Sequence, residues 1–303
     1  MFPIIPANSA QGVSATQKGI FGYGNTGSIS SLTNLVSSSG VVATDTTGVG
    51  TARTALAAAG YGLDKAIFGY GNSGSVTSIT NLVSNSGVVA TDTTGVGTAR
   101  SALAACGYGT DKAIFGYGST ASVLSISNLV NTVGTVAADV TGVGTARNQL
   151  AAASYGGDKG IFAYGSTGGV SVLSISNLVN TVGTVAADVT GVGTARTQLA
   201  ACSYGGDKAV FGFGRPSGTL TAVTNKVSNI GVIATDTSGV GTARRNIAAC
   251  SYGGDKGIFG YGYDSGKLSM SNLVSNTGTV ASDVTGVGTA RASLAAAGYS
   301  TSA

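Results

Sequence analysis

The sequence predicts an all-β protein built from six tandem repeats. One pattern recurs with small changes: Gly-Val-Gly-Thr-Ala-Arg, an alanine-rich run and Phe-Gly-Tyr-Gly, clearest from Gly95 to Gly118. The arginines of successive copies lie 47, 47, 49, 48 and 47 residues apart, a period typical of repeat architectures. These arginines are Arg53, Arg100, Arg147, Arg196, Arg244 and Arg291.

Each repeat is expected to contain four short strands. In the first repeat they fall at residues 18–24, 32–37, 41–46 and 53–61, where β-branched, aromatic and small residues run between glycines. Propensity alone would make the alanine-rich run a helix. The run is too short for a stable isolated helix and is followed by an Asp-Lys turn, which favours a strand in a hairpin. Four strands in about 47 residues, six times over, predict a six-bladed β-propeller with four-stranded blades.

The ends of the chain predict how the propeller closes. The chain enters the pattern at the Phe-Gly-Tyr-Gly strand and ends with an alanine strand, residues 292–299, that has no following partner. We expect this last strand to complete the first blade, which removes exposed sheet edges. Residues 18–303 then form the propeller and residues 1–17 an N-terminal tail. The apolar, proline-bounded start of the tail is either a strap on the domain or a peptide that docks on a partner subunit.

The middle strand of each blade is expected to pack against both neighbouring blades. We expect Phe68 and Tyr70 to face one neighbour, and Ile67 and Gly69 to face the other. A glycine at this position lets the aromatic layer of the adjacent blade approach closely.

The charge pattern excludes several classes of partner. Only 9% of residues are charged, and eleven of the twelve acidic and twelve of the sixteen basic residues occupy repeat-equivalent positions. The net charge of +4 is therefore spread around the repeats, without the basic stripe that nucleic-acid binding requires. No apolar window is long enough to span a membrane. Residues 1–12 do not resemble a signal peptide, so we expect cytoplasmic synthesis and a later virion or extracellular location.

The residue inventory disfavours catalysis. The chain has no histidine and no glutamate, which removes the commonest catalytic base and the commonest metal ligand. Cys106, Cys202 and Cys250 share a repeat position that holds alanine in the other copies, so we interpret them as small apolar fillers and not as a disulfide or metal set. The glycine motifs lack the following helix of a phosphate loop. We expect no enzymatic activity, catalytic residue, metal or cofactor.

The repeated charges are interpreted as structural. An aspartate present in every copy fixes a turn or pairs with arginine more readily than it singles out a catalytic blade; these are Asp45, Asp92, Asp139, Asp188, Asp236 and Asp283. Asp64-Lys65 and its copies are expected in turns. The repeated arginines are expected to clamp carbonyls or aspartates between blades, the alternative being a ring of six that binds an anion on the axis.

Two propeller families resemble this pattern. Residues 100–105, then 111–118, then Thr145-Ala146-Arg147 resemble the kelch repeat in layout, over residues 18–299. This resemblance implies a six-bladed propeller. The 47-residue period also resembles tachylectin-type propeller lectins, which bind one sugar per blade. Under the hypothesis of a lectin, Tyr23, Tyr70, Tyr117 and Tyr164 would stack on sugar rings; the favoured interpretation is that these tyrosines pack between blades.

The loop after each Phe-Gly-Tyr-Gly is the predicted recognition site. Nearly all the length variation and most of the off-pattern charge collect in this loop, and variable loops on a fixed scaffold commonly carry recognition. Neutral drift of the loops is the alternative. The candidate binding residues are Asn25, Asn72, Ser119, Ser166, Arg215, Tyr263, Asp264 and Lys267.

The sequence therefore predicts a non-enzymatic structural or recognition propeller, most simply a tail, fibre or capsid-associated component of a virion or phage. Its mechanism would be many weak contacts displayed on one rigid ring. The expected partners are other virion or surface subunits or a cell-surface glycan. The alternative is a lectin-like propeller with one site per blade.

Overall fold

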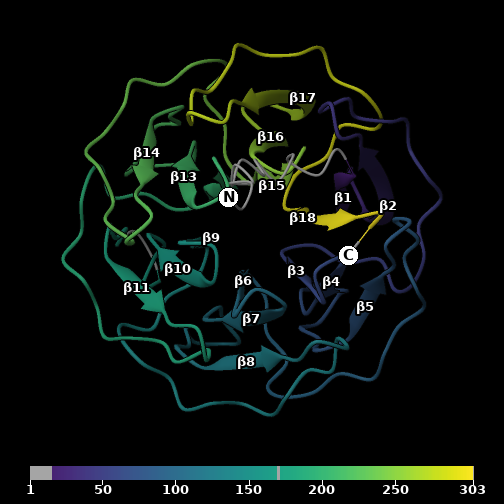
Figure 1. Cartoon of the computed structure of the whole chain (residues 1–303), viewed down its shortest axis with the longest axis horizontal. Helices are drawn as coiled ribbons and strands as arrows, with labels where there is room; N and C mark the ends of the chain where they lie inside the picture. The colour runs from purple at the N-terminus through teal and green to yellow at the C-terminus, as the bar shows by residue number, and fades with distance from the viewer. Residues whose placement is uncertain (1–15, 169–170, 303) are drawn as a thin grey trace, which may run out of the picture.

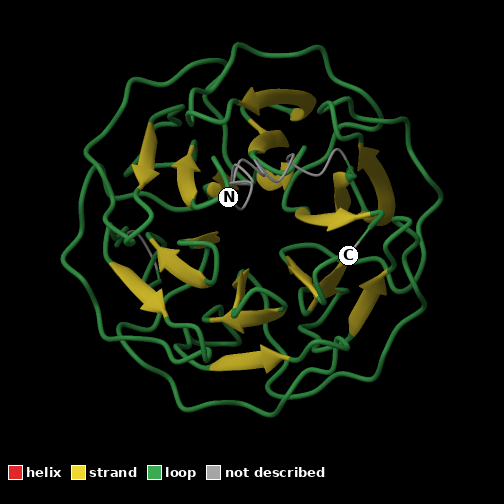
Figure 2. Cartoon of the chain, in the orientation of Figure 1, coloured by secondary structure: helices red, strands yellow, loops and turns green. Residues whose placement is uncertain are grey.

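The computed structural model describes residues 16–168 and 171–302 of the chain. All regular elements in these residues are β-strands, which form six three-stranded antiparallel sheets. The sheets stand around a common axis (Figure 1), and loops surround them on the outside (Figure 2). This arrangement is consistent with the predicted six-bladed propeller. The strap and docking interpretations of residues 1–6 lie outside the described residues.

Each sheet has an inner strand, a middle strand and a third strand toward the rim. The sheets are ordered β18-β1-β2, β3-β4-β5, β6-β7-β8, β11-β10-β9, β12-β13-β14 and β15-β16-β17. The strands are β1 (Gln17–Asn25), β2 (Ile29–Val36), β3 (Ala57–Tyr61), β4 (Lys65–Gly69), β5 (Thr80–Val83), β6 (Ala104–Tyr108), β7 (Lys112–Gly116), β8 (Ser127–Val130), β9 (Ala151–Tyr155), β10 (Lys159–Ala163), β11 (Ser176–Val179), β12 (Ala200–Tyr204), β13 (Lys208–Gly212), β14 (Thr224–Val227), β15 (Ala248–Tyr252), β16 (Lys256–Tyr263), β17 (Lys267–Val274) and β18 (Ala295–Ser300).

The C-terminal strand completes the first sheet, as the sequence predicted. Strand β18 pairs antiparallel with β1, with Ile20 opposite Ala297. The first and last strands are therefore paired in one sheet, where β18 lies beside β1 (Figure 1). Each sheet itself stays open, and neighbouring sheets pack face to face around the axis.

The prediction of four-stranded sheets is wrong, because residues 41–46 do not form a strand. This segment follows β2 through isolated bridges such as Val36 with Val42. The fully buried side chain of Asn34 lies beside the segment, and its Nδ2 donates to the carbonyl of Ala43 at 2.9 Å. A side chain thus occupies part of the ladder that a fourth strand would need, and the same arrangement recurs in the other repeats.

The alanine-rich runs are strands, as predicted, and they are the inner strands nearest the axis. Ala57 and Ala59 of β3 are buried. Six inner strands converge near the axis, so only small side chains fit there. These strands begin later than the predicted residue 53, since Ala55 has a φ of 52°. A non-glycine residue in this left-handed region interrupts the extended backbone.

The predicted sidedness of the middle strand is wrong in one respect. The Phe68 ring packs edge-on against Tyr23 of the preceding sheet, with 5.1 Å between ring centroids. Tyr70 packs in the same way against Phe115 of the following sheet, also at 5.1 Å. The two aromatic residues therefore face opposite neighbours. The cause is the φ of 63° at Tyr70, which reverses the side-chain alternation of the strand.

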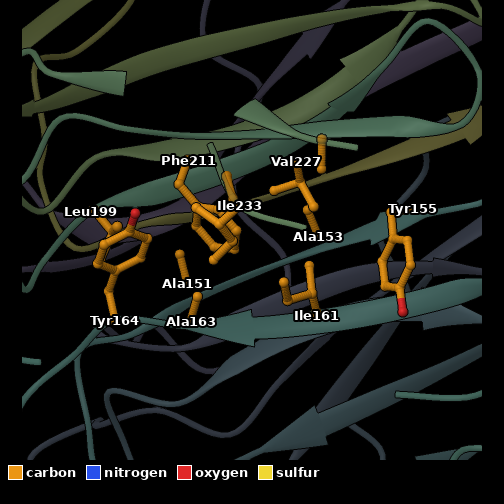
Figure 3. Close-up of a cluster of buried hydrophobic side chains, with 12 residues drawn as sticks. Ala151, Ala153, Tyr155, Ile161, Ala163, Tyr164, Leu199, Phe211, Val227 and Ile233 are labelled. Atoms are coloured by element: carbon orange, nitrogen blue, oxygen red, sulfur yellow. The ribbon is translucent and has the colours of Figure 1, made fainter. Parts of the chain in front are cut away.

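Small residues in the middle strand let these aromatic rings meet. A Cβ atom on Gly69 would lie 2.7 Å from Cζ of Phe115, so a side chain there would displace the ring. The sequence predicted this role for the glycine, and it is confirmed. Figure 3 shows the junction between β9–β11 and β12–β14, where Ala163 stands at this position beside Tyr164 and Phe211. There the Tyr164–Phe211 centroid distance is 5.4 Å, wider than at the other junctions.

Candidate recognition face

Six residues, one from each repeat, form a closed ring of backbone hydrogen bonds. Each ring residue donates its N–H to the carbonyl of its equivalent in the preceding repeat: Ala102 donates to Ala55, and Gln149 to Ala102, both at 2.8 Å. The bond from Ala55 to Ser293 closes the circle. All six have φ between 52° and 59°, which turns these groups toward their neighbours. The ring residues are Ala55, Ala102, Gln149, Gln198, Asn246 and Ser293.

The predicted recognition loops surround this ring. The first residue of each loop forms an isolated bridge with the residue that precedes a ring residue, as Asn72 does with Thr54 next to Ala55. The structure thereby brings six of the predicted site residues into one circle. They are Asn25, Asn72, Ser119, Ser166, Arg215 and Tyr263. Lys267 pairs with Tyr263, and Asp264 lies between them, so all eight share one face. We call it the ring face.

Some of the eight predicted residues stabilise their own loops. Asn25 and Asn72 accept hydrogen bonds from backbone N–H groups two residues ahead, at 3.0 and 2.9 Å. Ser166 is buried and accepts from Gly168 in its own loop, whereas Ser119 accepts from Asn148, next to the ring residue of the following sheet. These contacts hold the loops in one conformation, and they occupy the side chains that make them.

Of the remaining four predicted residues, Asp264 bonds its own loop, and the other three are exposed or half-buried. Asp264 accepts from the backbone N–H of Gly266 at 3.0 Å. This hydrogen bond and those from Ser265, opposed by slight burial, hold the pKa of the Asp264 carboxyl below its usual value. Arg215 is exposed, and Tyr263 and Lys267 are half-buried. Among the described residues, neither the Arg215 nor the Lys267 side chain has a carboxylate partner.

Sequence reasoning missed four polar residues on this face. Gln149, Gln198 and Asn246 are ring residues, and Arg245 stands immediately before Asn246. Comparing the six copies at the ring position would have found the first three, because the other copies carry alanine or serine there. Arg245 departs in the same way from the threonine, serine, asparagine or alanine of its equivalents.

These residues make the ring face chemically uneven. Arg245 lies over the Tyr263 ring at 5.3 Å, and its Nη1 is 3.5 Å from Oε1 of Gln198. Thr197 Oγ1 donates to Oε1 of Gln149 at 3.1 Å. A cavity of about 140 Å³ opens beside these groups, lined by Gln149, Ser166, Thr197, Gln198, Arg215 and Ser217 among others. We call the set Gln149, Gln198, Arg215, Arg245, Asn246 and Tyr263 the polar sector.

The opposite face, the turn face, carries the Asp-Lys turns. The predicted turns are confirmed, and they are joined by a second circle of backbone bonds, of which Gly62 to Asp111 at 2.8 Å is one. Asp111 and Lys112 form an ion pair at 2.8 Å, but both side chains are about a third or more exposed, so the pair adds little stability. A cavity of about 250 Å³ lies inside this circle, bordered by Gly60, Gly107, Ser154, Ser203, Ser251 and Gly298 among others.

The repeated arginines are clamps between sheets, as predicted. Arg53 is fully buried, donates from Nε to the carbonyl of Tyr70 at 2.9 Å and donates from Nη2 to Asn81 at 2.6 Å. Its guanidinium also stacks over the Tyr23 ring of the preceding sheet at 4.4 Å. All six arginines have no exposed area, so the alternative of an anion-binding ring on the axis is wrong.

The repeated aspartates tie each sheet to the segment that enters it. Asp92 accepts from the backbone N–H and the Oγ1 of Thr51, at 3.0 and 2.6 Å, and from Nδ2 of Asn81 at 2.9 Å. Partial burial alone would raise the pKa of Asp92, but the hydrogen bonds from Thr51 and Asn81 outweigh it and hold that pKa below the usual value. These contacts occupy both carboxylate oxygens with structural donors.

The repeated tyrosines and the cysteines lie inside the protein. Tyr23 and Tyr70 are fully buried, and Tyr23 donates to the carbonyl of Val49 at 3.1 Å. The interpretation that these tyrosines and their copies pack between blades is therefore confirmed, and the alternative that they stack on sugars is wrong. Cys106 and Cys250 are free and buried, and burial raises the pKa of each thiol to about 12. Within the described residues, no group of three or more acidic or cysteine side chains could hold a metal ion.

Neither a protein-family model nor a curated protein matches the chain. The kelch resemblance is therefore supported only at the level of six antiparallel sheets in a repeated layout. Across residues 16–168 and 171–302 there is no helix long and apolar enough to cross a membrane.

Proposed function

We propose that this chain is a non-catalytic recognition propeller that binds its partner through the ring face. One observation carries the proposal. Five charged residues depart from the repeat pattern, and four of them lie on the ring face; these are Arg215, Arg245, Asp264 and Lys267. The fifth, Lys226, donates to the carbonyl of Thr277 at 2.9 Å, outside this face.

The repeated charges support a role without chemistry. The buried arginines clamp neighbouring sheets, the six aspartates accept hydrogen bonds from threonine and asparagine, and the turn lysines pair with the adjacent aspartates. Of the charges outside these sets, Lys18 lies in β1 and Lys226 donates to Thr277, and the other four collect on one surface. A surface so separated from the structural charges suits recognition.

The scaffold favours preorganised binding. Each ring residue is hydrogen-bonded to the ring residues on both sides of it. The side chains of Asn25 and Asn72 accept backbone hydrogen bonds that fix the surrounding loops. A binding surface that is rigid before contact avoids the entropy cost of ordering on association. We propose that rigidity of this face, displayed on six kelch-like sheets, is the working property of the protein.

The uneven chemistry of the ring face disfavours six equal sites. The polar sector covers three consecutive sheets, β9–β11, β12–β14 and β15–β17, while the facing ring residues Ala55, Ala102 and Ser293 are small. We propose one asymmetric binding site, within a component of a virion or phage appendage that is made in the cytoplasm and acts on a particle or outside the cell. The partner would be a cell-surface glycan or another surface subunit.

Blocking each face in turn tests the proposal. Thr120→Cys places a thiol in an exposed ring-face loop, and Asn85→Cys places one in an exposed turn on the opposite face. The native thiols are buried with raised pKa values, so a maleimide-polyethylene glycol label reacts at the introduced cysteine. Both labelled proteins are assayed on an array of neutral and acidic glycans and for co-sedimentation with purified particles. Binding lost only with the ring-face label supports the proposal; binding lost only with the turn-face label contradicts it.

A further inference from the structure

We infer that the polar sector contains a carboxylate-binding subsite for an acidic sugar, between Gln149, Gln198 and Arg215. The inference rests on the proposed function and names the ligand class of that face. The three side chains come from consecutive repeats and line the cavity of about 140 Å³.

The two glutamines present hydrogen-bond donors to this cavity. Oε1 of Gln149 accepts a hydrogen bond from Oγ1 of Thr197 at 3.1 Å, and Oε1 of Gln198 accepts one from Nη1 of Arg245 at 3.5 Å. Each carboxamide oxygen is thus engaged, while neither amide nitrogen has an acceptor within residues 16–168 and 171–302. Two amide N–H₂ groups are therefore left to donate to a ligand.

Arg215 adds a positive charge to these donors. Its backbone is held by two hydrogen bonds to Thr197, at 2.8 and 3.1 Å, which fixes the start of its side chain beside the cavity. The off-pattern acid of this face, Asp264, is bound to its own loop through Gly266. A guanidinium flanked by amide donors suits a carboxylate, which accepts two parallel hydrogen bonds from arginine.

The size and lining of the cavity favour a sugar over a peptide. A volume of about 140 Å³ accommodates a small head group, and the hydroxyls of Ser166 and Ser217 stand beside the apolar Val172 and Pro216. Hydroxyl groups and the C–H face of a sugar match such a lining. An extended peptide would need a free strand edge, but the backbone of the neighbouring ring residues is already paired.

The repeats supply substitutions that preserve the fold. Arg215→Asn introduces the residue found at equivalent positions 25 and 72, and Gln198→Ala the one at 55 and 102. Lys226→Leu is the matched control, because it also removes one positive charge and restores the leucine of the other repeats, away from the ring face.

The test is calorimetric titration of the full chain with D-glucuronate, N-acetylneuraminate and D-glucose. We expect at least one acidic sugar to bind, and we expect the affinity for glucose to be lower by about tenfold or by a larger factor. Arg215→Asn should lower the affinity for that acidic sugar about tenfold, Gln198→Ala should lower it by a smaller factor, and Lys226→Leu should leave it unchanged.

Three results would overturn the inference. The first is that both acidic sugars bind no more tightly than glucose. The second is that Arg215→Asn and Lys226→Leu lower the affinity for the acidic sugar equally. The third is that a hexa-aspartate peptide, and not the sugars, binds in a way that depends on Arg215. Any of these, combined with binding that is lost only when the ring face carries the label, would remove the subsite and leave the proposed function standing.

Discussion

Ala55 and Ser293, near opposite ends of the chain, are joined by a 2.8 Å backbone hydrogen bond that closes the ring of six. The bond needs the left-handed backbone of both residues, with φ of 52° and 55°. It connects the closure of the fold to the surface proposed for recognition, since the predicted loops are bridged to the residues beside the ring.

Breaking this ring should destabilise the whole molecule. In Ala55→Pro the N–H is lost and the proline ring cannot adopt a positive φ, so we expect a loss of about 3 kcal/mol or more in the free energy of unfolding. Ala55→Gln, which copies Gln149, should change it by less than about 0.5 kcal/mol. Urea unfolding followed by circular dichroism measures both. Equal stability of the two variants would show that the ring contributes nothing.

The aromatic junctions should depend on the small residue in each middle strand. Gly69→Ala would place a methyl group against the Phe115 ring, so we expect a loss of about 1–2 kcal/mol in unfolding free energy. The natural Ala163 and its wider Tyr164–Phe211 spacing indicate that the ring can shift a little, which keeps the cost moderate. Thermal unfolding checks this. The control is Gly266→Ala, because a Cβ on Gly266 would meet no described atom within 4 Å and, like Gly69, this glycine has no positive φ.

The buried arginine–asparagine bonds should differ between repeats. Asn81→Ala leaves Nη2 of the buried Arg53 without its 2.6 Å partner, which we expect to cost about 2–3 kcal/mol. In the equivalent pair, Arg196 Nη2 and Asn225 Oδ1 have no hydrogen-bond partner in the part of the chain that the structure describes. Asn225→Ala should therefore cost about 1 kcal/mol less than Asn81→Ala. Chemical denaturation of the two variants compares them directly, and the reverse order would refute the assignment.

Stability should fall in acid because of the repeated aspartates. The pKa values of Asp92 and its copies are held below 3.8 in the folded protein, so the unfolded chain binds more protons as the pH drops. Their contribution is complete above about pH 4 and is lost as the pH falls through the depressed folded values. Urea midpoints at pH 7 and pH 3 measure the loss. Asp92→Asn should reduce the pH dependence, and an unchanged midpoint across this range would contradict the account.

The sequence predicted the features that repeat and missed those that depend on individual backbone angles. The period of the arginines and the glycine-bounded strands were enough for six all-β repeats and for closure by β18. The side reversal at Tyr70 and the ring at Ala55 require positive φ in non-glycine residues, which residue type does not reveal. The fourth strand was predicted from β-branched residues, but the side chain of Asn34 takes over part of its pairing.

The candidate site was predictable in place but incomplete in composition. Comparing loop lengths and off-pattern charges located Arg215, Tyr263 and their loop neighbours on one face. Gln149 and Gln198 were missed because they lie in the otherwise uniform segment after the arginine, and only the ring of hydrogen bonds brings them to the loops.

Hydrogen exchange of the protein with and without its bound glycan or surface subunit tests the central claim most directly. The proposal predicts slower exchange confined to peptides that cover residues 145–150, 196–200, 215–221 and 263–268. Protection centred instead on the turn-face residues 62–65 and 84–89, with the ring face unchanged, would contradict it.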